Sequence, residues 1–259
     1  MKLQNHVISL KNALQRRQHI EAQFGQQNID FQFFDAVTTT EVDEYCKILN
    51  INFAPDALTS GEQACFISHA MLWYKMVVEN THHMAIFEDD VFLGENAKQF
   101  LTQSDWLVAE WHIVKLEAFS KKVLMSKPKA LSSSDRGLAV LKGRHLGGAG
   151  YILDLQFAKH LLHIIQQNPI IEPLDHILFD PAYHQTQYHL YQMTPALCIQ
   201  GYLYETENNI FFSGLENQRV VRRKGESKAR GVVAKLQREF KRLLVQINTF
   251  LHKKPMQFR

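Results

Sequence analysis

The sequence has 259 residues, of which 46% are hydrophobic, and it carries 29 Lys and Arg against 26 Asp and Glu. These values are typical of a globular chain of one large or two small domains, and they exclude disordered, fibrous and collagen-like proteins. The three cysteines are far apart and form no CxxC pair, so neither a disulfide framework nor a cysteine zinc site is supported. Because no apolar stretch is long enough for a signal peptide or a membrane span, we expect a cytoplasmic protein.

The charge is distributed unevenly along the chain. Residues 222–259 contain twelve Lys or Arg and two Glu, a net charge of +10, whereas residues 1–221 are mildly acidic. We therefore predict a body, 1–221, and a basic tail, 222–259. In the tail, apolar residues recur every three or four positions from Val232 to Leu251, which predicts a basic amphipathic helix. Such a helix can lie on an anionic membrane surface; the alternative is that it packs on the body.

The N-terminal half alternates between strand and helix patterns. The apolar run at residues 6–10, a helical pattern from Leu14 to Phe24, and FQFFDAV at 31–37 predict a strand–helix–strand unit with parallel strands. A polar helix is expected near 41–50. A largely buried helix is expected to start at an N-cap at Ser60 and to extend to Val78.

The second half of the body continues this alternation. Strand patterns occur in MAIFEDDVFL (84–93), WHIVKLEAF (111–119) and GYIL (150–153), and the amphipathic segment 155–167 predicts a helix that ends before Pro169. Strands that alternate with helices favour an α/β fold with a mostly parallel central sheet.

Three consecutive carboxylates, Glu88, Asp89 and Asp90, follow an apolar strand. Like charges at this density repel one another, and a bound hard cation such as Mg²⁺ or Mn²⁺ would offset the repulsion. Strand alternation places Glu88 and Asp90 on one face, where they could hold the metal, and Asp89 on the other, where it could bind backbone or sugar. The alternative is an acidic loop that caps a helix.

Several segments together point to a family. VISLKNALQRR, FFDAV, LTSGEQACFISHAMLW, IFEDDV, VKLE, GGAGYIL and PLDHIL occur in this order from residue 7 to about residue 200. In these segments the chain resembles glycosyltransferase family 25, the lipooligosaccharide galactosyltransferases of Gram-negative bacteria. The resemblance covers about three quarters of the chain and leaves the basic tail outside.

The resemblance implies a GT-A-like fold, a UDP-sugar donor, a divalent metal at Glu88 and Asp90, and transfer with inversion. It places three groups of residues at the donor: Ser9, Leu10, Arg16, Arg17, Asp35, Ala36 and Val37; Gly61, Glu62, Ser68 and His69; and Asp89, Gly148, Ala149 and Tyr151. Some of these residues could instead have purely structural roles. The arginines could form a solvated helix face, Glu62 could stabilise a helix N-terminus, and His69 could be a core histidine.

An inverting transfer needs a base that deprotonates the acceptor hydroxyl. Asp175 matches the acidic position of the family; His176 and Asp180 are its rivals, and Asp175 could instead cap the helix after Pro173. Many GT-A enzymes take a further metal ligand, often a histidine, from late in the fold. Gln200 lies near that place, although glutamine would be an unusual ligand there.

The leading hypothesis is a metal-dependent glycosyltransferase that moves galactose from UDP-galactose to a terminal sugar of a lipid-linked oligosaccharide. The basic tail would hold it on the inner face of the cytoplasmic membrane. UDP-glucose or a UDP-N-acetylhexosamine are alternative donors. A non-enzymatic carbohydrate or nucleic-acid binder is the alternative of another class; we expect no nucleic acid, because the tail has few aromatic residues. A phosphohydrolase is disfavoured because no P-loop is present.

Overall fold

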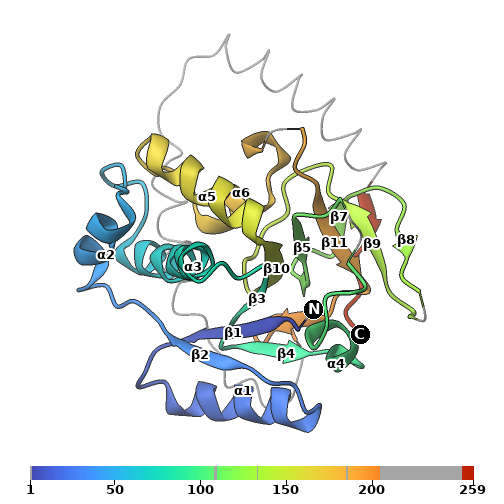
Figure 1. Ribbon diagram of the computed structural model, residues 1–259. Helices are drawn as coiled ribbons and strands as arrows, with labels where there is room; N and C mark the ends of the chain where they lie inside the picture. Colours follow the sequence, from blue (N-terminus) through green and yellow to red (C-terminus); the bar gives the residue numbers. More distant parts are fainter. Residues whose placement is uncertain (1, 108–109, 133, 185, 205–252) are drawn as a thin grey trace.

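The computed structural model describes residues 2–107, 110–132, 134–184, 186–204 and 253–259, which form an α/β structure around an eight-stranded sheet (Figure 1). The strand order is β2-β1-β3-β10-β5-β11-β9-β8. These strands are β1 (Gln4–Ser9), β2 (Gln32–Asp35), β3 (His83–Glu88), β5 (Ile113–Lys115), β8 (Lys129–Ala130), β9 (Gly137–Val140), β10 (Gly150–Asp154) and β11 (Leu190–Thr194). Two smaller sheets contain β4 (Val91–Leu93), β6 (Glu117–Ala118) and β12 (Cys198–Gln200), and β7 (Lys122–Leu124) with β13 (Lys253–Pro255).

The helices largely follow the sequence pattern. They are α1 (Leu14–Gln26), α2 (Val42–Leu49), α3 (Ser60–Val78), α4 (Ala97–Leu101), α5 (Leu155–Gln167), α6 (Leu174–Phe179) and the short 3-10 helix η1 (Pro181–Tyr183). The predicted strand–helix–strand unit is confirmed as β1-α1-β2 with parallel strands. The N-cap of α3 is Thr59 rather than Ser60, because the Thr59 side chain accepts the Glu62 N–H and Glu62 bonds back to the Thr59 backbone.

The expectation of a mostly parallel sheet is wrong. Among the described strands of the large sheet, three pairs are parallel and four are antiparallel, so the sheet is mixed. Strand β10 runs antiparallel to both of its neighbours, β3 and β5. It is nevertheless as buried as a parallel central strand, because its side chains alternate between two hydrophobic cores on the two faces of the sheet. A buried pattern therefore does not reveal the direction of the strand.

Two hydrophobic cores lie on the two faces of the sheet. Successive strand residues alternate between them: Ile8 and Tyr151 point to one core, whereas Val7 and Ile152 point to the other. Helices α2, α3, α5 and α6 cover the first face, and α1 covers the opposite face (Figure 1). This arrangement leaves the strand ends between the helix layers accessible for a site.

The C-terminal residues return to the body. Strand β13 pairs with β7, the Ala196 N–H donates to the Gln257 carbonyl (2.7 Å), and Arg136 donates to the Arg259 carbonyl. The last seven residues of the segment predicted as a basic tail are therefore part of the folded body. The predicted amphipathic helix and the boundary at residue 221 lie outside the described residues. Within the described residues, no helix is long and apolar enough to cross a membrane.

Candidate active site

The candidate site lies at the edge of the large sheet where β1, β2 and β3 end at Ser9, Asp35 and Glu88. Because β10 runs in the opposite direction, it brings its first residues to the same edge, and Ala149 O accepts the Glu88 N–H at 3.0 Å. Ligands of open α/β sheets bind at this type of edge. The three carboxylates, which the sequence places directly after an apolar strand, therefore lie at this edge of the sheet.

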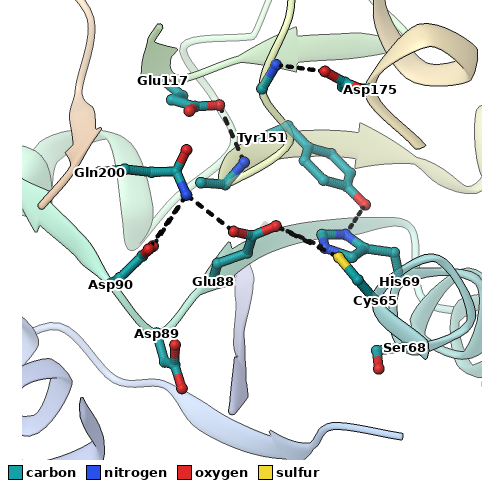
Figure 2. Close-up of polar contacts among 12 residues, drawn as sticks. Cys65, Ser68, His69, Glu88, Asp89, Asp90, Glu117, Tyr151, Asp175 and Gln200 are labelled. Atoms are coloured by element: carbon teal, nitrogen blue, oxygen red, sulfur yellow. Dashed lines mark hydrogen bonds and ion pairs between the residues drawn. The ribbon is translucent and has the colours of Figure 1, made fainter. Parts of the chain in front are cut away.

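Glu88, Asp90 and Gln200 form an acidic centre (Figure 2). Gln200 Nε2 donates to Glu88 Oε2 at 3.1 Å and lies 3.3 and 3.4 Å from the two Asp90 oxygens. Gln200 is brought here by the pairing of β12 with β4, which places it opposite Val91. Burial, and then the nearby Glu88 carboxylate, raise the pKa of Asp90 to about 7.

These three side chains fit a hard divalent cation. Two carboxylates on one side of the motif supply oxygen ligands, and a cation between them would offset both the burial and the repulsion of Asp90. A half-turn of the Gln200 amide would replace its Nε2 with the carbonyl oxygen, which is also a ligand for hard cations. A cation bound by these residues would offset the negative charge of a diphosphate.

Asp89 points away from this centre, as strand alternation predicted (Figure 2). The Ser9 hydroxyl donates to Asp89 Oδ2 at 2.7 Å, and Arg16 Nη1 donates to Asp89 Oδ1 at 2.7 Å. Charge-assisted bonds of this length fix the carboxylate firmly. The structure therefore brings together three of the residues that the resemblance placed at the donor, from β1, α1 and the end of β3.

A pocket of about 600 Å³ opens beside this group, at the ends of β1 and β2. Four residues that the resemblance placed at the donor line it: Leu10, Asp35, Ala36 and Val37. Sequence reasoning missed five further lining residues: Lys11, Asn12, Thr38, Glu41 and Tyr45. Tyr45 comes from α2, so only the folded arrangement of α2 against the strand ends could have placed it here.

Arg17 and Asp35 bind each other rather than pointing freely into the pocket. Arg17 Nη2 forms an ion pair with Asp35 Oδ1 and donates to Ser9 O at 3.0 Å, and its guanidinium lies 4.6 Å from the centroid of the Phe33 ring. Arg17 therefore ties the ends of β1 and β2 together.

Two of the four α3 residues that the resemblance placed at the donor, Glu62 and Ser68, make contacts that stabilise the fold. Gly61 and Glu62 lie in the first turn, where Glu62 completes the capping box with Thr59. The Ser68 hydroxyl donates to Ala64 O and accepts the Val37 N–H at 2.9 Å, so Ser68 fixes the wall of the pocket from inside. None of these contacts points to a direct role for Gly61, Glu62 or Ser68 at the donor.

His69 and Tyr151 lie beside Glu88, on the α3 side of the acidic centre (Figure 2). His69 Nδ1 is 2.9 Å from the Tyr151 hydroxyl, to which Trp73 Nε1 donates at 3.0 Å, and His69 Nε2 is 3.6 Å from Glu88 Oε1. Both side chains are fully buried, and burial raises the pKa of Tyr151 well above its usual value. They support the acidic centre from the core side.

A buried ion pair that sequence reasoning missed holds the loop before β10. Lys115 Nζ lies 2.8 Å from Glu117 Oε2 and donates to the Gly147 carbonyl, while Glu117 Oε2 accepts the Ala149 N–H at 3.1 Å. The signal was a Lys and a Glu within the apolar strand VKLE. Gly147 has a φ of +87°, and a Cβ on it would come within 2.6 Å of the Glu117 oxygens, so this close approach requires glycine. Gly148 instead packs on Leu174 of α6.

Asp175 lies in the first turn of α6, where Pro173 is the N-cap, so Asp175 does not cap this helix. Its Oδ2 accepts the Gly147 N–H at 3.0 Å, which orients the carboxylate along the loop (Figure 2). The two rival bases are engaged elsewhere. Asp180 binds Arg144 at 2.7 Å, and His176 Nδ1 lies 2.5 Å from Glu172 Oε2.

The fold and the site define an α/β protein with a pocket and an acidic centre at one sheet edge. Residues 2–178 match the model of glycosyltransferase family 25 (LPS biosynthesis protein), and the chain belongs to this family and is a glycosyltransferase. It is 37% identical to the lacto-N-neotetraose biosynthesis glycosyltransferase LgtE of Neisseria gonorrhoeae, over 84% of this chain and 82% of that protein.

Similarity extends to a second bacterial protein and to a solved structure. The chain is 34% identical to the lipooligosaccharide biosynthesis protein lex-1 of Haemophilus influenzae, over 86% of this chain and 84% of that protein. Among solved structures, it is similar to a glycosyltransferase involved in the glycosylation of the major capsid of PBCV-1, with 9% identity, 77% and 92% coverage, and a TM-score of 0.40.

Proposed function

We propose that this protein transfers a hexose, most simply galactose from UDP-galactose, to a terminal sugar of lipooligosaccharide with inversion. One observation carries the proposal: Ser9 and Arg16 bind Asp89, so the pocket at the ends of β1 and β2 is joined directly to the Glu88 and Asp90 centre. A nucleotide in the pocket and a diphosphate at the centre would lie along this one edge, as in a GT-A-like site. The lipooligosaccharide acceptor follows the names of the LgtE and lex-1 relatives.

In this mechanism, each group has a separate role. The pocket would hold the nucleoside, and the bond between Arg16 and Asp89 joins α1 to the end of β3 between the pocket and the acidic centre. Glu88, Asp90 and Gln200 would hold the cation that offsets the diphosphate charge. Asp175 takes the proton of the acceptor hydroxyl as that oxygen attacks the anomeric carbon, and the bond from this carbon to the diphosphate oxygen breaks so that UDP leaves. The Gly147 N–H holds one oxygen of Asp175 and thereby orients the other.

Calorimetric titration of UDP-galactose, UDP-glucose and UDP-N-acetylhexosamines, with Mn²⁺ and then with EDTA, tests the donor. We expect UDP-galactose to bind only with Mn²⁺, because the diphosphate charge must be offset at an already acidic centre. Tighter binding of another UDP-sugar would identify that UDP-sugar as the donor in place of UDP-galactose.

Substitution of Asp175 by Asn tests the base. We expect kcat to fall at least about 100-fold with unchanged donor affinity, because general-base catalysis contributes at this level. The Asn carbonyl can still accept the Gly147 N–H, so the loop should keep its place. Asp180→Asn is the matched control and should retain kcat. The reverse ranking of the two variants would move the base to Asp180.

We also propose that the basic segment 222–252, with nine Lys or Arg and two Glu, binds anionic membranes. The test is a variant in which a short Gly/Ser linker replaces residues 222–250. Residues 253–259 are kept, because they pack on the body. Tyr204 and Phe258 have ring centroids 5.4 Å apart, so described residues before and after the removed segment contact each other on the body. We expect this variant to lose binding to anionic vesicles in a flotation assay while keeping transfer to a soluble acceptor. Equal vesicle binding would refute the membrane role.

A further inference from the structure

Glu88 has two faces in this fold. Its Oε2 faces Gln200 and the acidic centre, whereas its Oε1 faces α3, where Cys65 Sγ lies at 3.8 Å and His69 Nε2 at 3.6 Å (Figure 2). The three ligand atoms of Cys65, His69 and Glu88 all lie within 4.8 Å of one another. Cys65 and His69 are four residues apart on α3, so one helix face presents both toward the end of β3.

The His69 ring is held so that one nitrogen faces this cluster. The side chain is fully buried, and its Nδ1 contacts the Tyr151 hydroxyl. Its Nε2 has no hydrogen-bond partner among the described residues, since 3.6 Å to Glu88 exceeds hydrogen-bond distance. A buried, unsatisfied ring nitrogen is costly. When Nδ1–H donates to Tyr151, Nε2 presents a lone pair to the cluster, as in histidines that bind metals and donate their other N–H to a second group.

The three ligand types select a softer metal than the acidic centre does. Thiolate, imidazole and carboxylate together are ligands of Zn²⁺, which binds three protein groups and one water in open tetrahedral sites. Zn–S and Zn–N lengths imply ligand atoms about 3.3–3.6 Å apart in such a site. The observed 3.6 and 3.8 Å from Glu88 Oε1 lie within a few tenths of an ångström of these lengths, and Cys65 Sγ and His69 Nε2, which lie within 4.8 Å of each other, would move closer together on binding.

We propose that Cys65, His69 and Glu88 form a Zn²⁺ site, distinct from the oxygen-ligand centre of Glu88, Asp90 and Gln200 and sharing Glu88 with it. On binding, the Cys65 thiol releases its proton to water as the Zn–S bond forms, and one water molecule completes the coordination. The ligands come from α3 and β3, so cysteine spacing along the chain could not reveal them. The site does not depend on transferase activity.

Cobalt spectroscopy of the full-length protein, freed of metal with EDTA and then dialysed, tests the site. We expect Co²⁺ to give intense tetrahedral d–d bands and a thiolate-to-cobalt charge-transfer band, both removed by Zn²⁺. Cys65→Ser should abolish the charge-transfer band and weaken Zn²⁺ binding at least about 100-fold. Loss of a residue that only supports a metal ligand already lowers metal affinity by about 10–100-fold, and loss of the ligand itself should lower it at least as much. Cys46→Ser, on helix α2 and outside the cluster, should retain the band. Asp90→Asn should also retain it, which separates this site from the acidic centre.

A second measurement needs no variant. Zn²⁺ should slow the alkylation of Cys65 in the wild-type protein and leave the alkylation of Cys46, which is also half-buried, unchanged when both are followed by mass spectrometry.

Tyr151→Phe should weaken Zn²⁺ binding about tenfold, because it removes the partner of His69 Nδ1. Co²⁺ spectra without the charge-transfer band, or equal protection of both cysteines, would overturn the site.

Discussion

Asp90→Asn should abolish Mn²⁺-dependent binding of the UDP-sugar and lower transfer at least about 100-fold, because removal of one group that offsets developing charge has effects of this size. The same substitution should stabilise the metal-free protein at neutral pH. Asp90 is buried next to Glu88, and its pKa is raised from 3.8 to about 7. Asn is isosteric with the protonated acid, and it carries no charge that burial and Glu88 disfavour.

The pH dependence of this stabilisation follows from the direction of the pKa shift. Between about pH 4 and pH 7, the folded protein holds a proton on Asp90 that the unfolded chain has released. The free energy of unfolding of the wild type therefore falls as pH rises through this interval, and Asp90→Asn removes that loss. In EDTA, the melting temperature of the variant should exceed that of the wild type at pH 8 and match it at pH 4.

Asp30→Asn provides the control, because Asp30 is exposed and pairs only with Lys2 among the ion pairs at that surface. It should change neither the Mn²⁺ affinity nor the difference in melting temperature between the two pH values. A destabilised Asp90→Asn protein at pH 8 would mean that Asp90 is needed for the fold itself. Retained Mn²⁺ binding would instead place the cation away from Asp90.

The parts of this fold that could be predicted from sequence are those with a local periodic signal. The β1-α1-β2 unit and α3 show continuous hydrophobic spacing, and the carboxylates are adjacent in the chain, so each could be assigned without knowledge of the sheet. Strand β11 was not predicted, because Gln192 interrupts its apolar run. In the structure Gln192 is fully buried, and its amide hydrogen-bonds to His145 and to the Lys115 carbonyl, so a polar residue satisfies a core position.

The site was predicted less completely, because its support comes from pairs distant in sequence. Ser9 meets Asp89 from 80 residues away, and Glu117 meets Ala149 from 32 residues away. Ser9 and Asp89 were each predicted at the donor from the resemblance, but no spacing indicated that they bind each other. In the sequence, Lys115 and Glu117 are two charged residues in a strand pattern, and only the folded sheet shows that both are buried as an ion pair.

Lys115→Met should be the most destabilising single substitution at the site and should cost about 3–5 kcal/mol, the usual cost when one partner of a buried ion pair is removed. Lys115 and Glu117 are both fully buried, and the ammonium also lies 4.5 Å from the centroid of the Phe179 ring. Without Lys115, the Glu117 carboxylate stays buried and keeps the Ala149 N–H as a partner, and burial already raises the pKa of Glu117. Chemical denaturation measures the loss, and the exposed Lys142→Met is the matched control.

The double variant Lys115→Met/Glu117→Gln separates stability from function. Neutral side chains of similar volume remove the unpaired charge, so most of the lost free energy of unfolding should return. Transfer should not return, because Lys115 no longer binds the Gly147 carbonyl and the loop that orients Asp175 loses one anchor. A double-mutant cycle gives the coupling directly. A cost below about 1 kcal/mol for Lys115→Met, as in exposed ion pairs, would show that water reaches this pair and that the loop is held by other contacts.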